Sequence, residues 1–242
     1  MSRIIYQLND NDLTFPSPDL ALKEPNGLLA FDGDLSTPRL INAYHDGIFP
    51  WYSDGEPIMW WSPDPRAIIP IDNIVINKTL KKVLKRDTFR VTLNHAFEEV
   101  IDYCADAPFR KQEATWIVDD MQQAYINLHQ QGYAHSIEVW QEQTLVGGLY
   151  GVAINGFFSG ESMFYTQSNA SKVALVALAS LLKSIGVKFI DCQLINPFLA
   201  SMGCIEVSRA QFIQQKQHSL TILPNHDFWQ PRVINLSHLN AQ

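Results

Sequence analysis

Two polar clusters stand inside stretches whose other residues are typical of buried strands. The first is Glu161, within the aromatic and glycine-rich run 156–164; the second is Asp191 and Gln193, which follow the apolar run 187–190. Because side chains alternate along a strand, Asp191 and Gln193 are expected to project to one face. A carboxylate and an amide beside an apolar strand cost desolvation energy unless they have partners, so the pattern predicts a functional site.

Several familiar chemistries lack their motifs in this sequence. The run 160–164 has no second glycine of the kind a nucleophile elbow needs, and no glycine-rich phosphate-binding loop is present. The seven histidines show no pairing at metal-ligand spacing. Cys104, Cys192 and Cys204 are odd in number and have no C-x-x-C spacing, so we expect neither a disulfide framework nor a zinc site.

Length and composition indicate a globular protein with a substantial core. The chain has 242 residues, of which 46% are hydrophobic and 18% charged, which argues against disorder. The first ten residues contain no apolar segment of the signal-peptide type. No apolar run approaches the roughly 18 residues that a membrane helix needs. We therefore expect a reduced, cytoplasmic protein without a membrane partner.

Proline content divides the chain near residue 70. Nine of the 13 prolines lie in residues 1–70, which predicts a small, irregular N-terminal domain built around one helix. That helix is expected to begin after Ser36 and to stop at Gly47. The loops 49–52 and 60–65 hold three of the six tryptophans and look too proline-rich for regular structure. Such aromatics either cover a neighbouring domain as a hydrophobic lid or stack on a base, and taken alone they favour the first interpretation.

Residues 71–242 have the pattern of a larger α/β domain. Its expected elements are helices over 97–104, 118–130, 169–185 and 197–202, and strands over 135–140, 144–154, 156–164 and 187–191. An antiparallel meander, a buried helix and a further strand make the order of an acetyltransferase-like α/β fold. We therefore predict a mixed, mainly antiparallel sheet.

The net charge of −7 argues against nucleic-acid binding, but the basic residues are unevenly placed. Six of the 18 lie within thirteen positions: Lys78, Lys81, Lys82, Lys85, Arg86 and Arg90. Helical spacing puts Leu80, Val83 and Leu84 on the opposite face. Such a run, taken by itself, favours a solvated helix surface, with a phosphate-binding patch as the alternative.

An ordered series of motifs across residues 15–232 resembles the leucyl/phenylalanyl-tRNA–protein transferases. The motifs are GLLAFDGDL at 27–35, GIFPW at 47–51, WWSPDPR at 60–66, TWI at 115–117, HSIEVW at 135–140, GGLYG at 147–151, GESMF at 160–164, NASK at 169–172 and DCQ at 191–193. The resemblance implies transfer of Leu or Phe, and of Met as a further candidate, from aminoacyl-tRNA to proteins that begin with Arg or Lys. This forms a peptide bond and marks the acceptor for degradation.

The resemblance also implies roles for individual residues. Gln193 would contact the acceptor amine, and Asp191 would orient it or accept its proton. No cofactor is expected, because the aminoacyl ester is already activated and its aminolysis needs no ATP or metal. Glu161 would bind an ammonium or guanidinium group. The remaining implied positions are the apolar donor pocket of Leu149, Leu178 and Ile190, the adenosine-binding Trp51 and Trp116, and the basic residues from Lys78 to Arg90, which would meet acceptor-stem phosphates.

This chain departs from the family pattern at two places. Tyr165 and Thr166 stand where the family usually has Ser-Arg, and Phe198 stands where it usually has histidine. Two alternatives from other classes remain: a CoA-dependent N-acyltransferase and a non-catalytic module that binds tRNA or protein N-termini. The first is disfavoured because the segment 167–172, before the long helix, has no glycine to hold a pyrophosphate.

Overall fold

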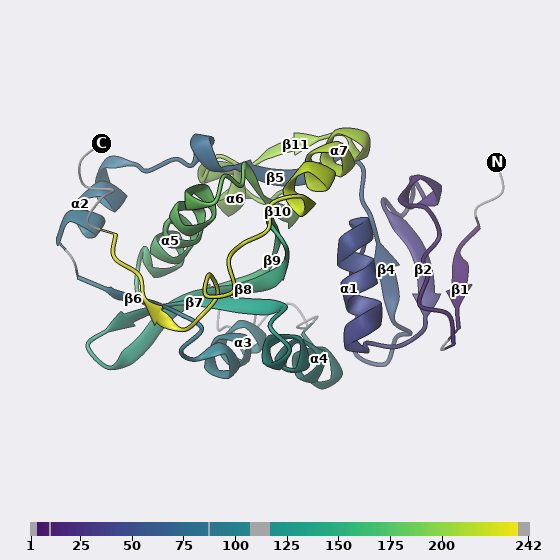
Figure 1. The fold of residues 1–242 in the computed structure, drawn as a ribbon, viewed down its shortest axis with the longest axis horizontal. Helices are drawn as coiled ribbons and strands as arrows, with labels where there is room; N and C mark the ends of the chain where they lie inside the picture. The colour runs from purple at the N-terminus through teal and green to yellow at the C-terminus, as the bar shows by residue number, and fades with distance from the viewer. Residues whose placement is uncertain (1–3, 10, 87, 107–116, 237–242) are drawn as a thin grey trace.

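A computed structural model describes residues 4–9, 11–86, 88–106 and 117–236 (Figure 1). The N-terminal part forms a four-stranded sheet in the order β1-β2-β4-β3. The elements of this part are β1 (Tyr6–Leu8), η1 (Pro18–Leu20), β2 (Leu28–Asp32), α1 (Thr37–Asp46), β3 (Phe49–Pro50) and β4 (Met59–Trp61). The predicted helix is confirmed as α1, which ends at Gly47 in the left-handed conformation with φ of 82°.

Two segments that were predicted to be irregular form short strands instead. β3 contains Pro50, but it lies at the edge of the sheet, where a strand tolerates the missing N–H. In β4, Trp60 is fully buried and its indole Nε1 donates a hydrogen bond to the Asp32 carbonyl oxygen at 2.9 Å. The burial of this ring explains why the proline-rich segment is ordered into a strand.

The larger sheet contains eight strands in the order β11-β5-β10-β9-β8-β7-β6-β12. β9 and β10 run parallel to each other, and the other neighbouring strands pair antiparallel. The bounds are β5 (Arg66–Pro70), β6 (Arg90–Leu93), β7 (Ala134–Gln141), β8 (Thr144–Ile154), β9 (Phe157–Tyr165), β10 (Phe189–Gln193), β11 (Ile205–Val207) and β12 (Arg232–Val233). This confirms the predicted fold class: a small N-terminal part and an α/β part with a mixed, mainly antiparallel sheet.

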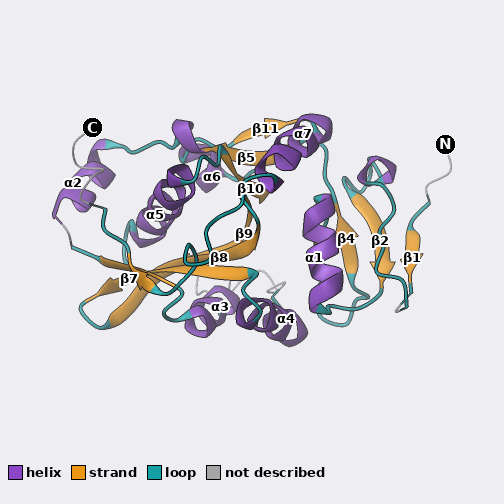
Figure 2. Ribbon diagram, in the orientation of Figure 1, coloured by secondary structure: helices purple, strands orange, loops and turns teal. Residues whose placement is uncertain are grey.

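Helices cover both faces of the large sheet (Figure 2). α3 (Phe97–Ala105) and α4 (Asp119–Gln130) pack on one face, and α5 (Ala170–Ser184), buried along most of its length, packs on the other. The remaining helical segments are η2 (Ile71–Asn73), α2 (Lys78–Arg86), α6 (Pro197–Ser201) and α7 (Arg209–Leu220). Among the described residues, no helix is both long and apolar enough to cross a membrane.

The N-terminal sheet shares one of the hydrophobic clusters with the large sheet. Leu40 and Ala43 of α1 belong to the same buried cluster as Met121 and Ala124 of α4. β5, which the sequence placed in the N-terminal part, pairs with β10 and β11 of the large sheet. The division into domains at residue 70 stays a prediction.

The two strands that carry the polar clusters are both irregular at those clusters. In β9, the register against β8 shifts so that Glu161 is the extra residue of a bulge. In β10, the register against β5 shifts between Asp191 and Gln193, which leaves Cys192 as the extra residue. Gln193 itself has φ of 55°, a left-handed conformation that is uncommon outside glycine. Bulges of this kind redirect side chains beside functional sites.

Candidate active site

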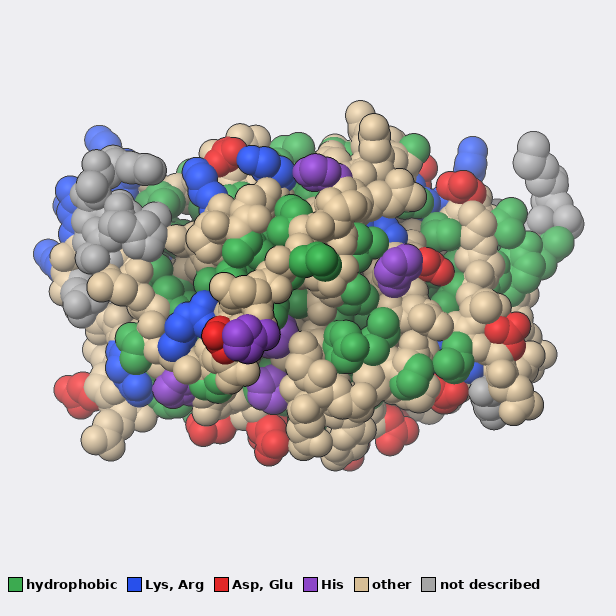
Figure 3. Space-filling model, viewed as in Figure 1, with side chains coloured by type: hydrophobic (Ala, Val, Ile, Leu, Met, Phe, Trp, Pro, Cys, Tyr) green, Lys and Arg blue, Asp and Glu red, His purple; other side chains and the backbone are tan. Residues whose placement is uncertain are grey.

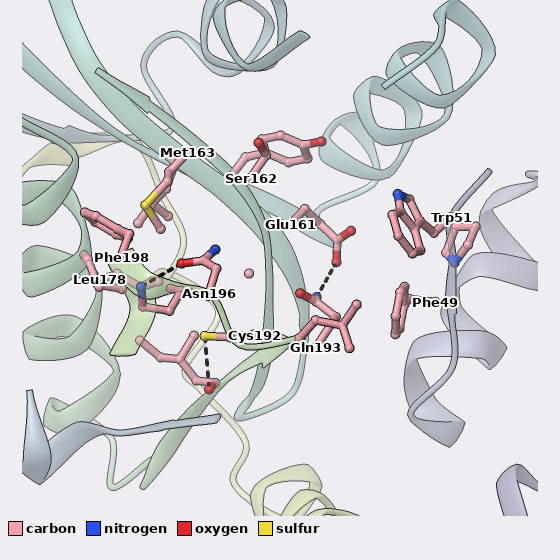
Figure 4. A pocket seen from close by; sticks show the side chains of 18 residues that line it. Phe49, Trp51, Glu161, Ser162, Met163, Leu178, Cys192, Gln193, Asn196 and Phe198 are labelled. Atoms are coloured by element: carbon pink, nitrogen blue, oxygen red, sulfur yellow. Dashed lines mark hydrogen bonds between the residues drawn. The ribbon is translucent and has the colours of Figure 1, made fainter. Parts of the chain in front are cut away.

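A cavity of about 340 Å³ opens between the large sheet, α5, α6 and the segment after β3 (Figure 4). One end is apolar, with Met163, Leu178 and Phe198. At the other end, Glu161 and Gln193 come from the sheet, and Phe49 and Trp51 face them from the N-terminal part (Figure 4). From one end to the other, the cavity therefore has an apolar slot, a polar centre and an aromatic wall.

Glu161 and Gln193 meet at the polar centre through Ser159. Gln193 Nε2 donates to Ser159 Oγ at 2.8 Å and to Glu161 Oε1 at 3.2 Å. Ser159 Oγ in turn donates to Asp191 Oδ2 at 2.9 Å. Asp191 and Gln193 are brought together at the same serine hydroxyl, but not by the regular alternation that the sequence predicted: the bulge at Cys192 interrupts it, and Cys192 lines the cavity beside Gln193 whereas Asp191 does not. Since these bonds use Nε2 of Gln193, its Oε1 is the atom left to accept a hydrogen bond from a bound molecule.

Asp191 does not line the cavity; it lies behind it in a buried ion pair. Its carboxylate is fully buried, and Arg66 Nε and Nη2 each donate to one of its oxygens at 2.7 Å. The Arg66 guanidinium also donates to the Gly47 carbonyl oxygen and lies between the rings of Phe49 and Phe212. A carboxylate with both oxygens engaged by a guanidinium is suited to orienting its neighbours, the first of the two roles predicted for Asp191.

Glu161 is the carboxylate that reaches the cavity. Burial raises its pKa to about 7, and hydrogen bonds from Tyr125 and Tyr44 oppose that rise, while the charge of Asp191 adds to it. Tyr125 donates from its hydroxyl to Glu161 Oε2 at 2.9 Å. A carboxylate with a pKa near neutrality can accept a proton at the pH at which an enzyme works. This is a different capacity from the cation binding predicted for Glu161 from the sequence.

The predicted apolar pocket residues come together in this cavity. Leu149, Leu178 and Ile190 all line it, from β8, α5 and β10 respectively. Phe198, where this chain departs from the family pattern, also lines it. Tyr165, the other departure, is 45% exposed at the end of β9 and does not line the cavity.

Of the two predicted adenosine-binding tryptophans, the structure places one. Trp51 lines the aromatic wall and is 40% exposed. Its ring lies 5.7 Å from that of Trp61, whose Nε1 donates to the Trp51 carbonyl oxygen at 2.6 Å. An exposed indole held in this way can stack on a ligand ring. Trp116 lies outside the described residues.

The predicted basic helix is confirmed as α2. Lys78, Lys81, Lys82, Lys85 and Arg86 are all exposed, whereas Leu80 and Leu84 are buried. Figure 3 shows basic side chains gathered at the edge of the molecule where α2 lies. Arg90 is separate from this group, since it belongs to β6 and its guanidinium lies 5.1 Å from the centre of the Trp140 ring. These residues are remote from the polar centre in sequence and in the fold.

Four residues of the site were not singled out from the sequence. They are Arg66 and Ser159, which hold Asp191, and Tyr44 and Tyr125, which lie behind Glu161. Arg66 had a detectable signal, a charged residue at the start of the apolar run 67–70. The two tyrosines occupy the buried faces of amphipathic helices, where an aromatic residue is ordinary.

Known proteins resemble this chain over most of its length. A model of the leucyl/phenylalanyl-tRNA protein transferase family matches residues 68–217, and a model of that family's N-terminal domain matches residues 33–64. The chain is 61% identical to the leucyl/phenylalanyl-tRNA–protein transferase of Colwellia psychrerythraea, covering 98% of this chain and all of that one. It is 52% identical to that of Pseudoalteromonas atlantica, over 94% of this chain and 97% of the relative.

Similarity to solved structures is much weaker. The structure of L-PGS from Bacillus licheniformis aligns with a TM-score of 0.40 and 11% identity, over 69% of this chain and 53% of that one. A likeness of this degree carries no argument here. The two family models and the near-complete coverage of the relatives do: this chain belongs to the leucyl/phenylalanyl-tRNA–protein transferase family.

Proposed function

We propose that this protein transfers leucine or phenylalanine, with methionine as a further candidate, from aminoacyl-tRNA to acceptor proteins. The acceptors begin with Arg or Lys, and the added residue marks them for degradation. The observation that carries the proposal is the order of surfaces in one cavity: an apolar slot, then Glu161 and Gln193, then the Trp51 indole. An aminoacyl ester of a terminal adenosine has its parts in this same order.

The donor would occupy the cavity from end to end. Its side chain would enter the slot beside Leu149, Leu178 and Ile190, and its adenine would stack on Trp51. The ester carbonyl carbon would then lie beside Glu161 and Gln193. An apolar slot separates side chains that differ by one methylene by only about 1–3 kcal/mol, but it excludes charged ones strongly. Leucine, phenylalanine and methionine would therefore be accepted to different degrees.

The reaction needs a neutral amine, a nearby ester carbonyl and a route for one proton. The α-amine nitrogen of the acceptor attacks the carbonyl carbon, and Glu161 accepts a proton from that nitrogen. The bond from the carbonyl carbon to the ribose oxygen breaks, and the oxygen leaves as a hydroxyl after taking the proton. An amide has formed and Glu161 is again a carboxylate. The step as written needs no oxidant, ATP or metal.

Gln193 would position the amine through its free Oε1, which can accept a hydrogen bond from the attacking N–H. Asp191 would act indirectly: with Arg66 it fixes Ser159, and Ser159 fixes the amide of Gln193. Holding reactants in a productive geometry accounts for a large part of the rate in such reactions.

The remainder of the tRNA would lie along the exposed basic face of α2. Contacts of this kind are made to phosphates and carry little sequence information, which suits an enzyme that selects its donor by the amino acid. In the same proposal, residues 1–70 form the part that supplies Trp51, and residues 71–242 form the part that supplies the polar centre. Trp116, expected at the adenosine, would complete the ring-binding wall.

A transfer assay separates this function from the alternatives. The protein is incubated with radiolabelled Leu-tRNA and a peptide that begins with Arg, and again with the same peptide acetylated at its N-terminus. Label that enters only the free peptide supports the proposal. Transfer that requires an acyl-CoA would indicate the CoA-dependent enzyme, and tRNA binding without transfer would indicate a binding module.

A further inference from the structure

Two tyrosine hydroxyls form a buried chain behind Glu161. The Tyr44 hydroxyl lies 2.5 Å from that of Tyr125, which donates to Glu161 Oε2 at 2.9 Å. Both tyrosines are almost completely buried, and neither lines the cavity. They can therefore influence the reaction only through Glu161.

The chain is assembled from three separate elements. Tyr44 comes from α1 of the N-terminal part, Tyr125 from α4, and Glu161 from the bulge in β9. Around the hydroxyls, the packing is apolar and aromatic: the ring of Tyr125 lies edge-to-face with that of Tyr150 at 5.5 Å. A hydroxyl buried in such surroundings must find a partner, and here the partner is a carboxylate of the site.

Either hydroxyl of the Tyr44–Tyr125 pair could donate, and the donation from Tyr125 to Glu161 sets the direction. An ionised carboxylate only accepts, so the Tyr125 hydroxyl donates to Glu161 and uses its oxygen to accept from Tyr44. Both hydroxyl hydrogens therefore point along the chain toward Glu161. Donors aligned on a carboxylate stabilise its charged form over its protonated form.

Other groups around Glu161 act in both directions. From β10 the amide of Gln193 donates to Oε1 at 3.2 Å, and Ser159 Oγ, which donates its hydrogen to Asp191, lies 3.3 Å from the same oxygen. The negative charge of Asp191, itself paired with Arg66, opposes ionisation of Glu161. Burial and the charge of Asp191 raise the pKa of Glu161, and the hydrogen bonds of the tyrosines from α1 and α4 lower it.

We propose that Tyr125, supported by Tyr44, is a positioning residue for aminoacyl transfer that holds the Glu161 carboxylate ionised and aimed into the cavity. The inference rests on the proposed function, in which Glu161 accepts the proton. It also links α1 to the reaction, because Tyr44, which supplies the second hydroxyl, belongs to this helix of the N-terminal part. A purely structural pair would fill the core without affecting the protonation of Glu161.

The test removes one oxygen at a time and keeps each ring. Tyr125→Phe and Tyr44→Phe are compared with wild type and with Tyr133→Phe, a half-buried tyrosine outside the cavity and without a contact to Glu161. Transfer from Leu-tRNA to an Arg peptide is measured at saturating substrate from about pH 5.5 to 9. We expect the midpoint of the acidic limb to move up by about one pH unit in Tyr125→Phe and by less in Tyr44→Phe. At high pH the rates should converge to within a fewfold, and Tyr133→Phe should follow wild type.

A second readout does not depend on activity. The Glu161 carboxyl is titrated by ¹³C NMR in the ligand-free proteins, with its signal assigned from Glu161→Gln. An upward shift of the Glu161 titration midpoint in Tyr125→Phe supports the inference, whether or not the peptide is labelled. If no peptide is labelled by the wild-type protein, the proposed function is wrong, and the NMR result still tests the effect of Tyr125 on Glu161. An unchanged midpoint in both readouts, with Glu161 titrating in wild type, overturns the inference. If Tyr125→Phe fails to fold, the same two comparisons with Tyr44→Phe decide.

Discussion

At the residue scale, one carboxylate is exposed to the cavity and the other is locked behind it. Glu161 reaches the cavity with its pKa raised to about 7 by burial, whereas Asp191 is bound on both oxygens. In the proposed mechanism, this division is the reason for giving proton transfer to Glu161 and orientation to Asp191. From the sequence, proton acceptance is predicted for Asp191, as an alternative to orientation, and cation binding for Glu161; those roles stay predictions.

Replacing Glu161 by Gln should remove the proton acceptor while preserving the size of the side chain. Transfer should fall by about 10²–10⁴-fold, the usual contribution of a general base, with little change in the KM for aminoacyl-tRNA. In wild type, the rate should rise as the pH passes upward through about 7, because only the carboxylate form accepts a proton. Steady-state rates between pH 5.5 and 9 check both points. A Glu161→Gln enzyme with an unchanged acidic limb would assign that limb to another group.

Removing Asp191 should cost folding stability as well as activity. Asp191→Ala leaves the Arg66 guanidinium buried without its partner, which typically destabilises a protein by about 3–5 kcal/mol. The double variant Arg66→Met/Asp191→Leu should recover most of that loss, because an apolar pair replaces the ion pair. It should not recover transfer, because Ser159 and Gln193 lose their anchor. Urea unfolding and the transfer assay separate the two effects, and a double variant with normal transfer would contradict the positioning role.

At the scale of elements, the C-terminal segment is fastened to β7 by a stacked pair of rings. His135 of β7 lies with its ring centre 4.0 Å from that of Trp229, and its Nδ1 accepts a hydrogen bond from Asn94 Nδ2 at 2.9 Å. His135 is 3% exposed, and burial, followed by the nearby His129, lowers its pKa to about 3. The folded protein therefore keeps this imidazole neutral.

This arrangement predicts a specific acid sensitivity. A histidine in an unfolded chain has a pKa near 6.5, whereas the pKa of His135 in the folded protein is about 3. Between these two pH values the unfolded state binds a proton at this residue and the folded state does not. The group should cost about 1.4 kcal/mol of stability per pH unit in that window. His135→Phe keeps the stack but not the titration, so its unfolding free energy should fall less between pH 7 and 5. His226→Gln, at an exposed position, should retain the wild-type slope.

At the scale of the whole molecule, the charge is separated in space. Basic side chains gather where α2 lies, and acidic side chains are spread along the lower edge of the view, near α3 and α4 (Figure 3). The net charge is −7, so the molecule as a whole repels RNA and α2 is the attractive surface we expect to contact phosphates.

Neutralising part of α2 tests that expectation. If these residues contact phosphates, log–log plots of tRNA affinity against salt should have a slope of about −0.7 to −0.9 per contact. Lys81→Gln/Lys82→Gln should flatten the slope by about one to two units and raise the KM for aminoacyl-tRNA. Transfer from a minimal aminoacyl-adenosine donor should be spared. Lys23→Gln/Lys188→Gln, at exposed positions outside α2, serves as the matched control, and equal slopes for the two double variants would remove α2 from the RNA surface.

Elements whose signals are local could be predicted from the sequence. Helix α1 is predicted from its stop at Gly47, β8 from its place after the polar turn 141–143, and the hairpin before β9 from Asn155-Gly156. Strand alternation does not describe Asp191 and Gln193, because the bulge at Cys192 interrupts it between them. The prediction of irregular structure failed at β3 and β4, because the burial of Trp60 in a sheet is a tertiary effect that outweighs the proline content.

The contacts between polar groups of the site depend on the packing of elements that are distant in the sequence. Arg66 lies 125 positions before its partner Asp191, and Tyr44 lies 81 before Tyr125. No local pattern encodes such pairs, since each residue taken alone fits an ordinary strand or helix. The proton affinity of Glu161 depends on what surrounds it after folding: burial, Asp191 and the two hydroxyls. The sequence therefore specifies which side chains can do chemistry, and the packing of distant elements specifies which of them does.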